Sequence, residues 1–205
     1  RYLEIFLQPL SSAESDLLVN SLLAVADLPA RLRERVLEKA AGNPFFVEEV
    51  VRTLIDRGVV VHDQRENRWV AVHNVEDIHI PNNLQSLLMA RIDRLEQEVR
   101  QTIQLAAVIG RSFYFRVLRD IAERDQSVLA QHMRQLQQGD LIQEAARLPE
   151  QEFVFRHVLV QETAYAMILH RQRREFHRRV GETLEALFPE RLEEHAVVLA
   201  YHFDQ

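Results

Sequence analysis

The chain has 205 residues and a formal net charge of -6; 47% of its residues are hydrophobic and 27% are charged. This composition supports one large globular domain or two small ones, and the negative charge does not suit a surface that coats a polyanion. Cysteine is absent, which excludes disulfides, thiolate metal sites and a cysteine nucleophile. No apolar run reaches the roughly 18 residues of a membrane span, so we expect a cytoplasmic chain without a membrane segment.

A phosphate-binding loop cannot be found. The five glycines stand far apart, and Lys39, the only lysine, has a glycine only after it, at Gly42. A P-loop needs clustered glycines, so that backbone N–H groups approach the phosphates, followed by a lysine. We therefore expect no catalytic site in this chain by itself. It begins on Arg1 without an initiator methionine and stops inside a helical pattern at Gln205, so we also expect an excerpt from a longer protein.

The first segments of the chain predict one strand followed by two helices. Residues 2–8 are rich in β-formers and predict a short strand. Ser11 and Glu14 have the spacing of a capping box, which predicts a helix start. That helix is expected to bury one apolar face, made of Leu17, Leu18, Leu22 and Val25. Pro29 then opens a second helix, which is expected to stop at Gly42.

A third helix is predicted from Asn43 and Pro44 to Gly58, with asparagine as N-cap and proline in the first turn. Its apolar residues recur three and four positions apart: Phe46, Val47, Val50, Val51, Leu54 and Ile55. Such a stripe is typical of a helix that packs on a core. Two short strands, 59–61 and 68–72, follow and predict a hairpin.

A second block begins at Pro81. Apolar spacing predicts four helices, over residues 84–95, 99–108, 115–121 and 128–136, and then a hairpin of strands 141–145 and 152–156. This order is typical of a winged helix-turn-helix. Three further helices, over residues 158–169, 171–188 and 189–203, predict the opening of an α-helical, TPR-like repeat array. The expected fold class is therefore mainly α, with small β-hairpins.

The turn at Gly42, Asn43 and Pro44 is the first candidate site. Proline at an exposed helix start presents a rigid apolar ring that can lie against a planar base, while the N–H groups behind it suit a polar ligand. The alternative is a well-capped turn between two helices with nothing bound. The residues alone favour that alternative, because capping chemistry recurs in many proteins.

His157 is the second candidate, because it leaves the last predicted strand just before a helix. Its imidazole could donate a hydrogen bond to a phosphate of a nucleotide held by a neighbouring domain. The alternative is a histidine that caps or packs at a strand–helix junction, and without further context the residues favour it.

Other charged segments are weaker candidates. The expected recognition helix, residues 126–138, offers only His132 and Arg134 beside several glutamines, so DNA binding is not expected. Five arginines between residues 171 and 179 are expected to form a solvated helix face. The histidine pairs at 170/177 and 195/202 lack metal-site spacing, so no metal site is expected.

The whole pattern resembles the STAND family, the signal-transduction P-loop ATPases with numerous domains, in the bacterial branch attached to cyclases and transcriptional regulators. The matching stretches are residues 7–11 (LQPLS), 42–49 (GNPFFVEE), 80–95, 105–110 (LAAVIG) and 155–165. The resemblance implies that residues 1–10 end a nucleotide-binding domain and that 11–80 form a helical lid with a β-hairpin. Residues 81–165 would form the winged-helix domain, and 166–205 would start a helical-repeat sensor domain.

The resemblance also implies a function, which is the regulatory part of an ATP/ADP-dependent switch. The family's adenine-contacting proline corresponds to Pro44, beside Asn43, and its β-phosphate-contacting histidine corresponds to His157, followed here by Val158 rather than aspartate. The nucleotide, with Mg in the parent ATPase, would be held by an upstream P-loop domain. Self-oligomerisation and a protein partner of the helical array are the other implied contacts. A winged-helix DNA-binding transcriptional regulator and a protein-interaction scaffold are the alternatives.

Overall fold

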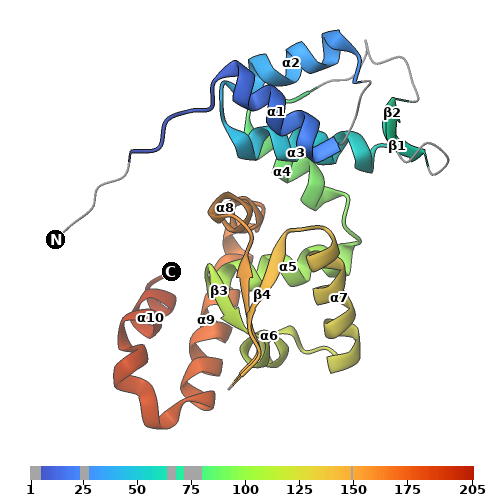
Figure 1. Cartoon of the computed structure of the whole chain (residues 1–205). Coiled ribbons are helices and arrows are strands. Elements are labelled where there is room, and N and C mark those ends of the chain that lie inside the picture. Colours follow the sequence, from blue (N-terminus) through green and yellow to red (C-terminus); the bar gives the residue numbers. More distant parts are fainter. Residues whose placement is uncertain (1–5, 24–27, 64–67, 72–79, 149) are drawn as a thin grey trace. The chain divides into compact units, whose positions relative to one another are not determined.

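A computed structural model describes residues 6–23, 28–63, 68–71, 80–148 and 150–205 (Figure 1). The fold is mainly α, with short antiparallel strands between the helices. The chain divides into two compact units, Arg1–Leu88 and Met89–Gln205. The division falls inside helix α4, Leu84–Asp93.

In its described residues, the first unit contains three helices and a hairpin before the start of α4. Its elements are α1 (Ser12–Leu23), α2 (Ala30–Ala40), α3 (Pro44–Asp56), β1 (Val60–Asp63) and β2 (Arg68–Ala71). The two strands pair antiparallel, with Val60 opposite Ala71. The predicted apolar stripe of α3 supplies much of the core, and five of its six residues are buried: Phe46, Val47, Val50, Val51 and Leu54. Both α1 and α2 pack against α3.

The capping box before α1 is confirmed. The backbone N–H of Ser11 donates to Glu14 Oε2 at 2.8 Å, and the N–H of Glu14 donates to Ser11 Oγ at 3.3 Å. These reciprocal bonds satisfy N–H groups that have no partner within the helix. The strand predicted over residues 2–8 lies partly outside the described residues. Its described part, residues 6–8, has no regular secondary structure.

The predicted buried face of α1 was wrong at Leu17 and Leu22, whereas Leu18 is half-buried. Leu17 is 67% exposed and Leu22 is 38% exposed, whereas Ser15 and Val19 are buried; Val25 lies outside the described residues. Ser15 and Val19 are four positions apart and share one side of the helix. Leu17 lies two positions from each of them, which places it on the opposite side.

The second unit combines helices with a three-stranded sheet. Its elements are α5 (Gln97–Ile109), β3 (Ser112–Tyr114), α6 (Phe115–Ala122), α7 (Gln126–Gln138), β4 (Ile142–Ala146), β5 (Glu152–Phe155), α8 (Val158–Ala166), α9 (His170–Leu187), the 3₁₀ turn η2 (Pro189–Arg191) and α10 (Leu192–Asp204). The sheet order is β3-β5-β4 and all pairs are antiparallel. The hairpin of β4 and β5 confirms the strands predicted near 141–145 and 152–156.

Strand β3 was not predicted. It has three residues, of which only Phe113 is buried. Its sequence is therefore too short to show the alternation of apolar and polar residues that predicts a strand. Phe113 pairs with Phe153 of β5, and its ring lies 6.0 Å from that of Phe153 and 5.8 Å from that of Phe155. The strand therefore forms because β5 offers it a free edge and an aromatic cluster to bury.

The last helices pack on the rest of the second unit. Helix α8 contacts α5, helix α9 contacts α5 and α6, and α10 packs along α9. Gly181 permits the close approach of α10, because a Cβ at this position would lie 2.7 Å from the ring of Phe203. No helix among the described residues is long and apolar enough to cross a membrane.

Candidate functional site

The turn before α3 is built from capping interactions. Asn43 Oδ1 accepts hydrogen bonds from the N–H groups of Phe45 at 3.0 Å and Phe46 at 3.3 Å, and Pro44 occupies the first helical turn. This confirms the predicted cap. Asn43 and Pro44 are both exposed. The proline ring and the positive end of the α3 dipole thus face solvent together, where a ligand can reach them.

Gly42 joins this turn to the segment before α1. Its φ of +77° is in the left-handed region, and its carbonyl accepts a hydrogen bond from the N–H of Leu10 at 2.8 Å. A Cβ at this position would lie 2.5 Å from the Leu10 carbonyl oxygen and 2.8 Å from Pro9 Cβ. Glycine is therefore required for the chain at Pro9 and Leu10 to lie directly against the exposed turn.

His157 lies at the junction between β5 and α8 in the second unit, whereas Asn43 and Pro44 belong to the first. It is the N-cap of α8, and its Nδ1 accepts a hydrogen bond from the N–H of Leu159 at 3.1 Å. An accepting Nδ1 places the proton of the neutral ring on Nε2. The capping alternative from the sequence is therefore confirmed, and the contact with a phosphate stays a prediction.

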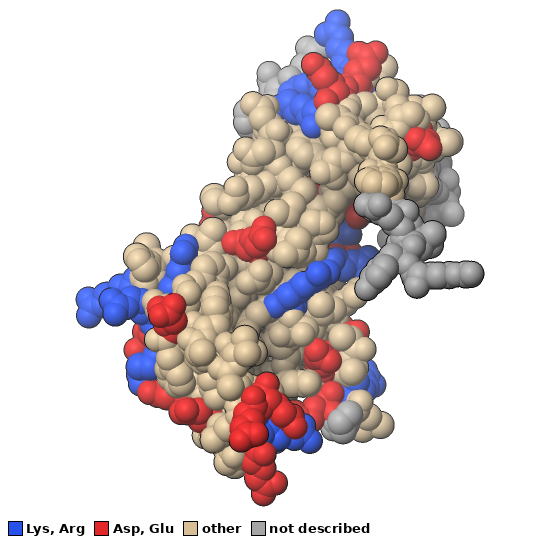
Figure 2. All heavy atoms as spheres, turned by 90° about the vertical axis from the view of Figure 1, so that its left-hand side faces the viewer, with Lys and Arg blue, Asp and Glu red and all other residues tan. Residues whose placement is uncertain are grey.

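The expected recognition helix α7 exposes less basic charge than its sequence suggests. His132 is 6% exposed, and its Nδ1 lies 2.9 Å from Thr102 Oγ1 of α5. Burial lowers its pKa, which favours the neutral ring. Arg134 stays exposed, beside Gln131 and Gln138. Figure 2 shows a different face of the molecule, on which Lys and Arg side chains lie in several separate places with Asp and Glu among them.

The predicted arginine face of α9 is only partly a solvated surface. Arg173 donates to the carbonyl oxygens of Ile168 at 2.9 Å and Ala166 at 2.8 Å. Arg179 is half-buried and hydrogen-bonds to the carbonyl of Ile121 in α6. These two arginines link α9 to its neighbours.

A series of hydrogen-bonded polar side chains connects α8, α9 and α10. It was not predicted from the sequence. The hydroxyl of Tyr165 lies 3.0 Å from His177 Nε2, and His177 Nδ1 lies 2.8 Å from His202 Nδ1. Both histidines are almost fully buried. Burial lowers the pKa of His177, and burial together with the charge of His177 lowers the pKa of His202 to about 4. Within the described ranges, no group of three or more His, Asp or Glu side chains could hold a metal ion.

Parts of the chain are similar to known proteins in two comparisons. Residues 11–68 match a family model described as a domain of unknown function, DUF8739; the match runs from the capping box into the β1–β2 hairpin. Over 112 residues the chain is 27% identical to hybrid signal transduction histidine kinase G of Dictyostelium discoideum. That match covers 54% of this chain and 3% of the kinase.

Proposed function

We propose that the chain is the regulatory lid and winged-helix segment of an ATP/ADP-dependent signal-transduction switch of the STAND type. In the parent protein, an upstream P-loop domain holds the nucleotide and its Mg ion and supplies the ATPase chemistry. This segment contacts the nucleotide through Pro44, with Asn43 beside it, and through His157. It couples the bound nucleotide to oligomerisation or to an output domain, and it works in the cytoplasm.

The arrangement of the second unit supports the winged-helix part of the proposal. The order α5, β3, α6, α7, β4, β5, with the sheet order β3-β5-β4, agrees with the order expected of a winged helix-turn-helix. The partial similarity to a signal transduction kinase agrees with a role in signalling. The part of the proposal that concerns ATP and ADP rests on the resemblance to the STAND family.

The observation that carries the proposal is the Nδ1 bond of His157. Because Nδ1 accepts from the N–H of Leu159, the neutral ring carries its proton on Nε2, where it can donate to a phosphate oxygen. A switch needs a ligand contact that differs between its two states. In the ADP state His157 would donate to the β-phosphate, and the contact would be lost in the ATP state.

Surfaces for the implied partners are also available. Helix α10 exposes several large apolar side chains, among them Leu192, Val197, Val198 and Tyr201. These side chains would suit the next helices of a repeat array or a protein partner of that array. Duplex DNA is a weaker candidate partner, because α7 buries His132 and leaves Arg134 as its only arginine.

A substitution at His157 tests the nucleotide contact. His157→Ser keeps an N-cap residue of a favoured type but cannot reach a phosphate. In the parent protein with its P-loop domain, we expect about a tenfold loss of ADP affinity, the effect of one hydrogen bond to a charged group. ATP affinity is expected to change by less than about twofold, because the contact belongs to the ADP state.

The same variant in the 205-residue chain serves as the stability control. Its thermal unfolding should match that of the wild type, because the cap is retained. Equal ADP affinity in variant and wild-type parent protein would show that His157 only caps α8.

A further inference from the structure

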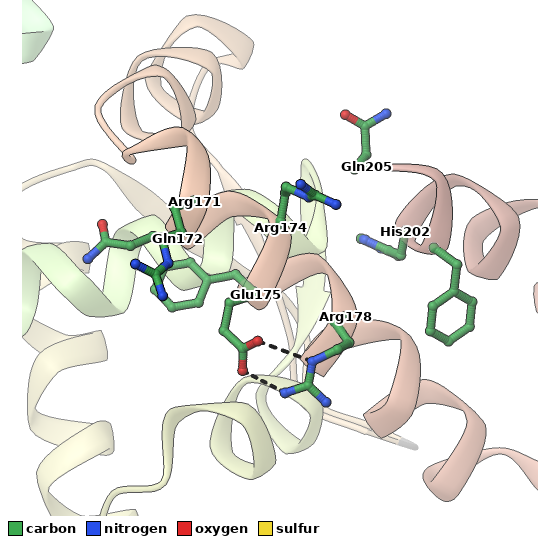
Figure 3. A pocket seen from close by; sticks show the side chains of 9 residues that line it. Arg171, Gln172, Arg174, Glu175, Arg178, His202 and Gln205 are labelled. Atoms are coloured by element: carbon green, nitrogen blue, oxygen red, sulfur yellow. Dashed lines mark hydrogen bonds and ion pairs between the residues drawn. The ribbon is translucent and has the colours of Figure 1, made fainter.

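A groove lies between α9 and α10 of the second unit, and its lining does not include the residues proposed to contact the nucleotide. It encloses about 700 Å³, a size that suits a small-molecule ligand. Its wall includes Arg171, Arg174 and Arg178 from α9 and His202, Phe203 and Gln205 from α10. In Figure 3, Arg174 and His202 extend toward one another from the two helices.

The three arginines of the groove differ in their partners. Arg178 is neutralised, because its guanidinium pairs with Glu175 at 2.6 Å and with Glu182 at 2.5 Å. The guanidinium groups of Arg171 and Arg174 make no ion pair or hydrogen bond with any described residue. They are exposed and three positions apart on α9, so they are neighbours on its surface. Arg171 and Arg174 thus place two positive charges without a paired carboxylate on the groove, in a chain of net charge -6.

His202 supplies an independent observation. Its side chain is 2% exposed, and its Nδ1 is hydrogen-bonded to His177 Nδ1. Its Nε2 is buried and has no hydrogen-bond partner among the described residues. A buried polar atom without a partner costs about 1–3 kcal/mol, so native proteins usually satisfy such atoms. Since His202 lines the groove, a ligand there can supply the missing partner.

We propose that this groove binds a small anionic ligand through its phosphate or carboxylate oxygens. One oxyanion is held between Arg174 and His202 Nε2, and Arg171 attracts a second negative charge. The site is independent of the nucleotide contacts proposed above, since neither Pro44 nor His157 lines it.

The directions of the hydrogen bonds fit an anion. When the hydroxyl of Tyr165 donates to His177 Nε2, the His177 proton lies on Nδ1 and is donated to His202 Nδ1. The proton of His202 then lies on Nε2, where it needs an acceptor. A phosphate or carboxylate oxygen is such an acceptor, and it also suits the forked donors of arginine. The ring of Phe203, which is 52% exposed, offers a surface for the body of the ligand.

An NMR titration of the 205-residue chain tests this site. Inorganic phosphate and citrate are the two probes, one for phosphate and one for carboxylate oxygens. At least one probe is expected to shift the side-chain resonances of His202 with a saturable dependence. Arg174→Gln should weaken that binding about tenfold, and Arg171→Gln should weaken it in the same direction.

Arg134→Gln is the matched control, because it removes one exposed positive charge from α7 of the same unit. It should leave the affinity within about twofold of the wild type, the effect of general charge alone. The proposal is overturned if neither probe gives a saturable shift at His202, or if Arg134→Gln weakens binding as much as Arg174→Gln. Neither result would affect the nucleotide proposal, because the titration does not involve the P-loop domain.

Discussion

Gly42→Ala is expected to destabilise the first unit by about 2–4 kcal/mol. The left-handed φ of +77° costs an alanine about 1–2 kcal/mol. A larger part comes from the new Cβ, which would lie 2.5 Å from the Leu10 carbonyl oxygen, so the backbone at Leu10 must move. Urea unfolding followed by tryptophan fluorescence measures the effect in this unit alone, because Trp69, in β2, is the only tryptophan.

Gly58→Ala separates the two contributions. Gly58 also has a left-handed φ, +64°, but nothing lies within 4 Å of the Cβ that alanine would add. This variant should therefore show only the conformational cost, about 1–2 kcal/mol. Equal destabilisation by the two substitutions would mean that the segment at Pro9 and Leu10 does not hold its place against the turn.

The second unit is expected to lose about 2 kcal/mol of stability between pH 7 and pH 5, because of His202. An unfolded histidine takes up a proton near pH 6.5, whereas burial and the charge of His177 lower the native pKa of His202 to about 4. Between these values the unfolded state binds more protons. Stability is therefore complete above about pH 6.5 and falls as the pH is lowered toward 4. The lowered pKa of His177 acts in the same direction.

His202→Gln tests the assignment, because glutamine keeps a hydrogen-bonding side chain but does not titrate. Urea unfolding followed by circular dichroism at pH 5, 6 and 7 should show a pH dependence at most half that of the wild type. His170→Gln removes an exposed histidine from α9 and should behave as the wild type does. Trp69 fluorescence provides an internal control, since the first unit should unfold alike in both variants. A wild-type slope in His202→Gln would rule out His202 as the source.

Features set by neighbouring residues could be predicted from the sequence. The capping box at Ser11 and the N-cap at Asn43 depend on side chains within three positions of the N–H groups that they satisfy. The buried stripe of α3 follows from helical spacing alone. The helices, the two hairpins and the mainly α class were predictable for the same reason.

Features set by distant residues could not be predicted. Strand β3 depends on pairing with β5, about 40 residues further along the chain. The sequence indicates an exposed, basic His132. Its burial depends on Thr102 of α5, which is distant in the sequence. His177 contacts His202 between two helices. The residues next to each histidine in the sequence do not indicate this contact. The capping role of His157 was foreseen as an alternative, because a histidine before a helix has few other local partners.

Hydrogen–deuterium exchange of the parent protein, with and without ADP, tests the nucleotide proposal most directly. The amides to follow are residues 45–48 at the start of α3 and residues 158–161 at the start of α8. If Pro44 and His157 contact the nucleotide, ADP should slow exchange at both helix starts by about tenfold, while the β1–β2 hairpin exchanges as before. Identical exchange at both helix starts in the ADP-bound and nucleotide-free protein would contradict the account.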